Sequence, residues 1–138
     1  MTDVEEVTSL LFSYCHAYDA GDVQRLRSLW TEEAVMVTAR GEQPHEALER
    51  LAEGAPAWKG KGRHLVHNPL VRVHGETAEF SAYWTVVGLP AEGPTLAGTG
   101  SYRGTAAKTP RGWRITRFGI EAIVMDRARL GPGSSSNG

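Results

Sequence analysis

Residues 77–88 read Thr-Ala-Glu-Phe-Ser-Ala-Tyr-Trp-Thr-Val-Val-Gly. Apolar side chains occupy the even positions from Ala78 to Val86, and polar side chains occupy most of the odd positions. A period of two is typical of a β-strand, because successive side chains point to opposite faces of a sheet. The stretch therefore predicts a strand with one buried and one polar face, as in an antiparallel sheet that is covered on one side.

Three further stretches with a period of two surround this strand, over residues 63–74, 95–106 and 113–124. Tight turns link them, at Gly75-Glu76 and at residues 109–112. Pro69 interrupts the first of these strands. We expect a bulge or an edge position there, because proline has no N–H to donate to a neighbouring strand. The second half of the chain is thus predicted to form the sheet.

The first part of the chain has helical spacing instead. Thr2 and Glu5 match a capping box, which begins a helix. Apolar residues then recur every three or four positions, as on one face of a helix, at Val4, Val7, Leu11, Tyr14 and Tyr18. Gly21 is expected to end this helix, and the carboxylate of Asp22 is placed to cap a second one.

The order of elements favours an α+β domain over a parallel α/β fold, because helices come first and strands follow. We predict a second helix over residues 23–30, a short strand over 34–38 and a third helix over 45–52, which begins after Pro44. One domain is expected over residues 1–128, with the helices packed on a curved antiparallel sheet around a pocket. The Gly- and Ser-rich residues 129–138 predict a disordered tail.

The composition excludes several classes of function. The chain has 138 residues, a formal net charge of −1 and no basic run, so no nucleic-acid partner is expected. Its first residues are acidic and polar and no apolar run could span a bilayer, so neither a signal peptide nor a membrane partner is expected. Cys15 is the only cysteine, so no internal disulfide can form, which suits a cytoplasmic location.

Asp19 is the first candidate for chemistry. It lies at the edge of the apolar stripe, near the C-terminal end of the first helix, where the helix dipole disfavours a negative charge. A partly buried carboxylate in such a place is a candidate proton acceptor. A surface aspartate in a turn is the alternative interpretation of the same residue.

His64 is the second candidate, because imidazole can carry protons near neutral pH. Strand alternation places His64, Val66 and Asn68 on one face, which makes Asn68 a candidate ligand-binding residue. His67 would point to the opposite face, so the two histidines are not expected to share a metal ion, and no metal site is predicted. An exposed or merely structural histidine is the alternative for His64.

Aromatic and small polar residues complete the predicted pocket. Tyr14 and Tyr18 share the inward face of the first helix, and each hydroxyl needs either a backbone partner or a substrate oxygen. Three tryptophans either line the pocket or fill the core, namely Trp30, Trp58 and Trp84. Ser101 points into the pocket in one register of its strand and out of it in the other, and both registers remain open.

Several chemical signatures are missing from the sequence. It has no phosphate-binding loop before a helix, no nucleophile elbow and no pair of cysteines. Nucleotide, covalent and zinc chemistry are therefore disfavoured, and no cofactor is expected.

Three strings carry a resemblance to a known family: Tyr18-Asp19-Ala20-Gly21-Asp22 with Leu26-Arg27-Ser28-Leu29-Trp30, Arg63-His64-Leu65-Val66-His67-Asn68, and Gly112-Trp113-Arg114-Ile115. Over about residues 3–125 the chain resembles the SnoaL-like branch of the nuclear transport factor 2-like superfamily. That superfamily includes scytalone dehydratase, ketosteroid isomerase, limonene epoxide hydrolase and small polyketide cyclases. The resemblance implies a cone-shaped α+β barrel and a homodimer or higher homo-oligomer.

The dehydratase pattern places a tyrosine–aspartate pair of the first helix against a strand histidine, and Tyr18, Asp19 and His64 match it. It implies a dyad in which Asp19 orients His64, the general acid–base, while a tyrosine hydroxyl polarises a carbonyl. The chain departs from the pattern because the dehydratase's second histidine is missing near Tyr83-Trp84. The isomerase and epoxide hydrolase patterns match less well.

We therefore predict a cofactor-independent enzyme that performs dehydration, or otherwise isomerisation or cyclisation, on a small, largely apolar, oxygenated molecule of secondary metabolism such as a polyketide. The predicted catalytic residues are Asp19, His64 and Tyr18. The predicted substrate-binding residues are Tyr14, Trp30, Asn68, Trp84 and Ser101. The alternatives are a non-catalytic module that binds a small molecule and an accessory subunit of a larger oxygenase.

Overall fold

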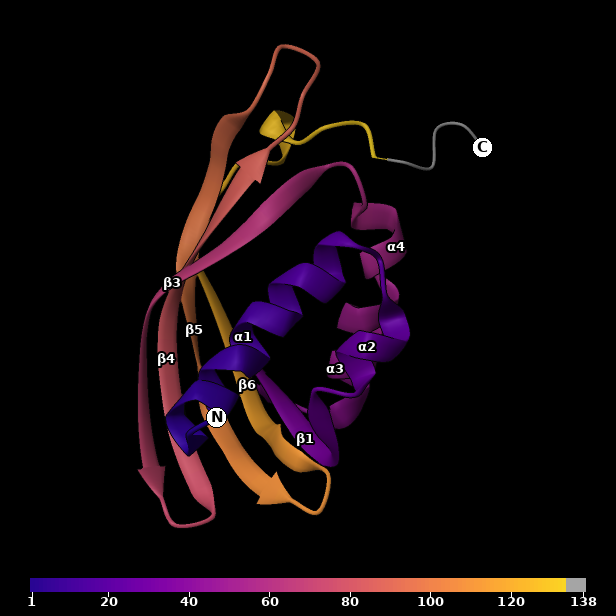
Figure 1. The fold of residues 1–138 in the computed structure, drawn as a ribbon. Helices are drawn as coiled ribbons and strands as arrows, with labels where there is room; N and C mark the ends of the chain where they lie inside the picture. Colours follow the sequence, from indigo (N-terminus) through magenta and orange to yellow (C-terminus); the bar gives the residue numbers. More distant parts are fainter. Residues whose placement is uncertain (134–138) are drawn as a thin grey trace.

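The structure is a computed structural model that describes residues 1–133. Within this part of the chain, helices cover one face of a single curved sheet (Figure 1). The elements follow in the order α1 (Asp3–Asp19), α2 (Val23–Arg27), β1 (Trp30–Thr38), β2 (Gly41–Gln43), α3 (His45–Glu53), α4 (Ala55–Trp58), β3 (Gly62–His74), β4 (Thr77–Gly88), β5 (Thr95–Thr109), β6 (Gly112–Met125) and the 3-10 helix η1 (Arg127–Arg129).

The sheet has six strands in the order β2-β1-β6-β5-β4-β3. Neighbouring strands run antiparallel except β1 and β6, which run parallel. Because β2 and β3 lie at opposite ends of this order, the barrel stays open and β3 has one free edge. The predicted α+β architecture is confirmed, with one parallel pair added to the expected antiparallel sheet.

The face of the sheet toward the helices holds the core. The alternation predicted from residues 77–88 is confirmed, since the even positions from Ala78 to Val86 are buried. The ring of Tyr14 on α1 lies 5.6 Å from that of Tyr102 on β5 and 4.9 Å from that of Phe118 on β6. The aromatic rings of α1 and the sheet therefore form one apolar layer.

The predicted helix starts are confirmed. The Oγ1 of Thr2 accepts from the N–H of Glu5 at 3.1 Å, and the Oε1 of Glu5 accepts from the N–H of Thr2 at 2.9 Å. The Oδ1 of Asp22 accepts from the N–H of Arg25 at 3.1 Å and caps α2. In each case a side chain satisfies an N–H that has no partner within its helix.

The boundary between α2 and β1 differs from the prediction. The predicted helix over residues 23–30 ends at Arg27, and Trp30 begins a strand that pairs with Ile115. The Oγ of Ser28 donates to the carbonyl of Arg25 at 2.6 Å and closes the last helical turn. Leu29 and Trp30 are both buried, but against the sheet. Apolar spacing alone does not distinguish a last helical turn from a first strand residue.

The C-terminal segment also differs from the prediction. The N–H of Gly131 donates to the carbonyl of Lys61 at 2.8 Å, and Leu130 packs against the core. The tail predicted to be disordered from residue 129 is therefore held in place through residue 131. Residues 134–138 of that prediction lie outside the described residues. Within residues 1–133, no helix is long and apolar enough to cross a membrane.

The sheet is packed closely around Gly104 on β5, so a substitution there tests this packing. A Cβ at this position would collide with the carbonyl oxygen of Arg117 and lie 2.7 Å from the Phe80 ring. We expect Gly104→Ala to lower the free energy of unfolding by about 3 kcal/mol in urea denaturation, because backbone on a neighbouring strand must move. Gly75→Asn is the matched control, since Gly75 has open space and a φ of 64° that asparagine tolerates. An equal loss in both variants would contradict this account.

Candidate functional site

Asp19 is the last residue of α1, and its carboxylate joins three structural elements. It accepts the indole N–H of Trp58 on α4 at 3.0 Å. It also accepts the backbone N–H of His64 on β3 at 3.0 Å, and the Nδ1 of the same histidine lies 2.7 Å from its Oδ1. These three donors fix the orientation of the carboxylate and stabilise it at a helix end where the dipole opposes its charge.

The local backbone explains why these groups meet. The chain leaves α1 through Gly21, whose φ of 70° turns it away from the helix axis. β3 is an edge strand, so alternate N–H groups point away from β4 and lack a partner within the sheet. The N–H of His64 is one of these groups, and Asp19 satisfies it. The carboxylate therefore attaches the end of α1 to the free edge of the sheet.

The contact with Asp19 also determines the form of the His64 ring. An ionised carboxylate can only accept a hydrogen bond, so Nδ1 carries a hydrogen, and in the neutral imidazole Nε2 then presents a lone pair. Within residues 1–133 no group forms a hydrogen bond with Nε2. His64 is thus arranged as a base whose other nitrogen is held by an acid residue.

Aromatic rings enclose the imidazole. Ring centroids lie 4.8 Å away for Trp58, 5.2 Å for Tyr18 and 6.2 Å for Tyr14. As a result, only 13% of the His64 side chain and 21% of the Asp19 side chain are exposed. This enclosure limits access of water to the pair, which strengthens the electrostatic interaction between them.

The neighbouring tyrosines remain protonated. Burial raises the pKa of Tyr18 and raises the pKa of Tyr14 well above its usual value. Both hydroxyls can therefore donate a hydrogen bond at neutral pH. Burial also raises the pKa of the Cys15 thiol to about 12, so this cysteine is not a nucleophile at neutral pH.

A groove of about 990 Å³ runs between α1 and β3 beside this pair. Asp19 and His64 both belong to its lining. Much of the rest is apolar, including Phe12, Leu65, Val66, Val87, Leu89 and Pro94. A small apolar molecule in this groove would lie next to the imidazole.

The structure brings four of the predicted site residues together: Tyr14, Tyr18, Asp19 and His64. Of these four, only Asp19 and His64 line the groove. Trp30 and Trp84 do not line it either, and both are buried in the core. Trp84 pairs with Val66 and so faces the same inner side of the sheet as His64. Its indole nitrogen has no hydrogen-bond partner among the described residues.

Asn68 lies outside this site, contrary to the prediction. The register of β3 against β4 shifts between His67 and Leu70, and Asn68 has a φ of 55° within this bulge. Its side chain is exposed, and its Oδ1 lies 3.1 Å from the Nδ1 of His67. The bulge expected at Pro69 therefore breaks the alternation that had placed Asn68 beside His64.

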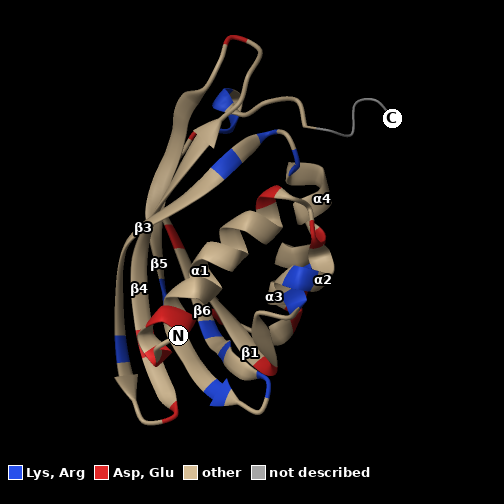
Figure 2. Ribbon diagram, viewed as in Figure 1, with Lys and Arg blue, Asp and Glu red and all other residues tan. Residues whose placement is uncertain are grey.

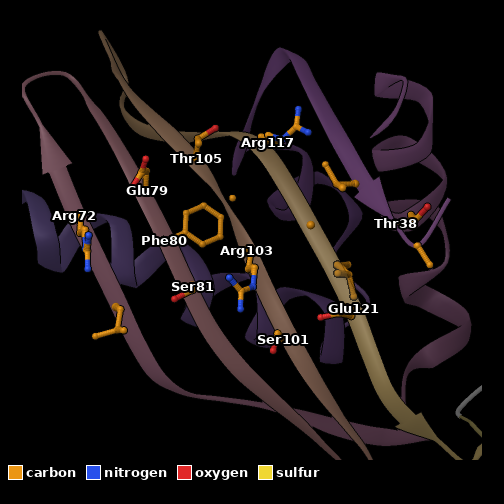
Figure 3. Close-up of a pocket in the computed structure, with 16 residues that line it drawn as sticks. Thr38, Arg72, Glu79, Phe80, Ser81, Ser101, Arg103, Thr105, Arg117 and Glu121 are labelled. Atoms are coloured by element: carbon orange, nitrogen blue, oxygen red, sulfur yellow. The ribbon is translucent and has the colours of Figure 1, made fainter. Parts of the chain in front are cut away.

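Ser101 is also outside the site. Tyr102 points into the core, so Ser101 points to the opposite face of the sheet. There it lines an open hollow of about 840 Å³ together with Ser81 and Arg103, on the face away from the helices (Figure 3). Of the two registers that the sequence left open for this strand, the structure has the one that directs Ser101 outward.

The sequence did not reveal the role of Trp58 in the site. It was a candidate for lining the pocket, but its indole N–H instead holds Asp19. It lies on the four-residue helix α4, which the sequence analysis did not predict. The only signal was its position six residues before His64.

Comparison with known proteins agrees with this fold. A family model of the SnoaL-like domain matches residues 1–119. The chain belongs to the SnoaL-like domain family. No curated protein sequence matches the chain.

Solved structures of similar fold come from several bacteria. A nuclear transport factor 2-like protein with a cystatin-like fold from Novosphingobium aromaticivorans has 24% identity and a TM-score of 0.78, over 97% of this SnoaL-like chain and 85% of the other. A Mycobacterium tuberculosis protein of unknown function has 23% identity and a TM-score of 0.75, over 86% and 70%. A candidate scytalone dehydratase from N. aromaticivorans has 18% identity and a TM-score of 0.74, over 90% and 89%. At these identities the likeness shows the fold.

The Asp19 carboxylate is expected to matter for the stability of this SnoaL-like domain. Asp19→Asn keeps the size of the side chain but replaces one acceptor oxygen with a donor that faces N–H groups. We expect a loss of about 2 kcal/mol in the free energy of unfolding, measured in urea. Asp22→Asn is the matched control and should change little, because asparagine caps a helix as well as aspartate does. Equal stability of the two variants would refute this role of Asp19.

Proposed function

We propose that this protein is a cofactor-independent acid–base enzyme, and that its reaction is the dehydration of a small, largely apolar, oxygenated molecule. The observation that carries the proposal is the 2.7 Å contact between His64 Nδ1 and Asp19 Oδ1 beside an apolar groove. An imidazole held in this way has one nitrogen committed to a carboxylate and the other free to exchange a proton. The fold shared with a candidate scytalone dehydratase supports the same reaction.

The proposed reaction needs one group that first takes and then returns a proton. Nε2 of His64 removes the proton next to a carbonyl, and the electron pair moves onto the carbonyl oxygen. The Asp19 carboxylate stabilises the imidazolium that results. When the carbonyl re-forms, the hydroxyl on the next carbon leaves and takes the proton from Nε2, so that the products are an enone and water.

In the proposed reaction a tyrosine hydroxyl donates to the carbonyl oxygen. Neither tyrosine lines the groove, so the carbonyl has to reach past the groove lining to the far side of the imidazole. The rings of Tyr18 and Tyr14 flank the imidazole, and both hydroxyls keep their protons because burial raises their pKa values. A hydroxyl directed at the developing oxyanion lowers the barrier more than the same contact would in water. Since β4 has no histidine near Tyr83-Trp84, the region that resembles the part of the dehydratase with its second histidine, His64 alone has to move the proton in both directions.

Turnover of 3-hydroxy-1-tetralone tests the proposal, because its loss of water yields fluorescent 1-naphthol. We expect His64→Ala to lower kcat/KM by at least about 100-fold, the usual contribution of a general base. Tyr18→Phe should lower kcat, because one hydrogen bond to the oxyanion is lost. His74→Ala is the control, since His74 is exposed at the far end of β3 and does not line the groove.

Full turnover by a folded His64→Ala protein would show that the dyad is wrong. A wild-type protein that binds the ketone in a thermal-shift assay but forms no 1-naphthol would favour the second candidate, a non-catalytic binding module. The observation that favours a non-catalytic module is that β4 contains no histidine, so His64 has no second imidazole to work with. Either result leaves the architecture unchanged.

We infer that the protein forms a homodimer through the sheet face opposite the helices. Apolar side chains are exposed there, with exposed fractions of 69% for Leu70, 54% for Tyr83 and 54% for Val124. The adjoining hollow in Figure 3 carries charges of both signs, including Arg103 and Glu121. A two-fold axis through such a face can bring opposite charges together and bury the apolar residues.

Light scattering coupled to size exclusion tests the dimer. We expect Tyr83→Glu to convert it to a monomer, because a buried unpaired carboxylate is costly. Val4→Glu is the control, because Val4 is an exposed apolar residue on α1, away from this face. A Tyr83→Glu protein that keeps the wild-type mass would place the interface elsewhere.

A further inference from the structure

Basic residues gather at the end of the molecule where Asp19 meets β3. Lys59, Lys61 and Arg63 occupy alternate positions between the two partners of Asp19, Trp58 and His64. A second basic pair, Arg127 and Arg129, lies on η1. Figure 2 shows both basic segments at the same end of the fold as α4. The chain as a whole has a net charge of −1, so this local excess of positive charge is not a general property of its surface.

Backbone contacts hold the two basic segments together. The carbonyl of Lys61 accepts the N–H of Gly131 at 2.8 Å and that of Leu89 at 3.0 Å. The N–H of Leu130 donates to the carbonyl of Arg127 at 3.2 Å. The chain after β6 therefore crosses beside the segment between α4 and β3, and η1 lies near the site.

Two of the five cations have an evident structural role. Arg129 forms an ion pair with Asp126 at 3.2 Å and donates to the carbonyl of Leu96 at 3.1 Å. The stem of Lys59 lies against Gly21, just after α1 ends. A cation in that place is favoured by the negative end of the helix dipole. Neither residue therefore needs a ligand to explain it.

The other three cations, Lys61, Arg63 and Arg127, have no carboxylate partner among residues 1–133. Arg63 belongs to the lining of the groove that passes Asp19 and His64. Lys61 and Arg127 do not line the groove themselves, but the bond from Gly131 to the carbonyl of Lys61 holds the chain after η1 beside the start of the strand that carries Arg63. The charge of Arg127 also opposes the rise that burial causes in the pKa of Tyr18. Like charges held near one another repel, and an anion among them relieves that repulsion.

We propose that Lys61, Arg63 and Arg127 bind an anionic group of the ligand, a carboxylate or a phosphate ester, while the apolar body of the same ligand lies in the groove beside His64. Arginine suits this task because its planar fork can donate two parallel hydrogen bonds to such groups. The inference deepens the proposed function by adding a negative charge to the substrate class. The anion site rests on the proposed function in one respect: it assumes that the ligand bound in the groove is the substrate of the enzyme.

Three probes of matched size test the proposal by calorimetry at low salt. They are 2-naphthoate, 2-naphthyl phosphate and the neutral 2-naphthamide. We expect at least one of the two anions to bind about tenfold more tightly than the amide, and to lose that advantage at high salt. The anion that binds more tightly identifies the group as a carboxylate or a phosphate ester.

Substitutions then locate the binding groups. Arg127→Gln and Lys61→Gln should each weaken binding of the preferred anion about tenfold and leave the amide unchanged, because each removes one charged donor. Arg111→Gln is the matched control, because Arg111 is exposed in the turn between β5 and β6, away from the groove. An amide that binds as tightly as both anions, or anion binding that is unaffected in both variants, would overturn the proposal.

The proposed dyad and the proposed anion site can be disproved independently of each other. Calorimetry on the His64→Ala protein measures anion binding where no turnover is expected. If His64→Ala keeps full turnover but Arg127→Gln loses anion binding, the dyad is wrong and the anion site stands. If His64→Ala is inactive and both anions bind no better than the amide, the dyad stands and the anion site is wrong.

Discussion

The site depends on one carboxylate that accepts three N–H groups. Asp19 receives the backbone and the imidazole of His64 and the indole of Trp58, and so connects α1, β3 and α4. Each hydrogen bond to a charged group contributes on the order of 1.5–3 kcal/mol, which offsets the cost of placing this charge at the C-terminal end of a helix. The same contact attaches the free edge of the sheet and selects the tautomer of the histidine. Stability and chemistry therefore draw on the same atoms, and a change at Asp19 affects both.

Periodicity predicted the elements because burial imposes it directly. The alternation over residues 77–88 and the helical stripe from Val7 to Tyr18 both follow from which side chains face the core, whereas Val4 at the start of the predicted stripe is exposed. The caps at Thr2 and Asp22 were equally predictable, because each depends on residues at most three positions apart. The α2–β1 boundary was not predictable, since Leu29 and Trp30 are buried in either state. Local patterns thus determined the elements but not every boundary between them.

The candidate site was predictable only in part, because a single bulge changes which side chains share a face. Asp19 and His64 were expected to meet, and they do. Asn68 was expected beside them, but the shift in register near Pro69 turns it outward. Trp58 was expected either to line the pocket or to fill the core, whereas its N–H holds Asp19 from a helix too short to show periodicity. The irregularity near Pro69 thus misplaced Asn68, while Trp84 and Ser101 lie outside the groove for another reason: alternation along a strand does not specify which face lines a pocket.

The position of Asp19 also bears on the cations around it. Its carboxylate lies within the same end of the fold as Lys61, Arg63 and Arg127, yet its oxygens are already engaged by three N–H donors. Within residues 1–133 no salt bridge joins Asp19 to any of these three side chains, so its charge is stabilised by the N–H groups of Trp58 and His64 instead. Asp126 is engaged in the same way, by Arg129 and by the N–H of Ala128. In the part of the chain that the structure describes, no salt bridge pairs these three cations with a carboxylate, and an anionic ligand that enters the groove beside Arg63 is placed to supply that charge.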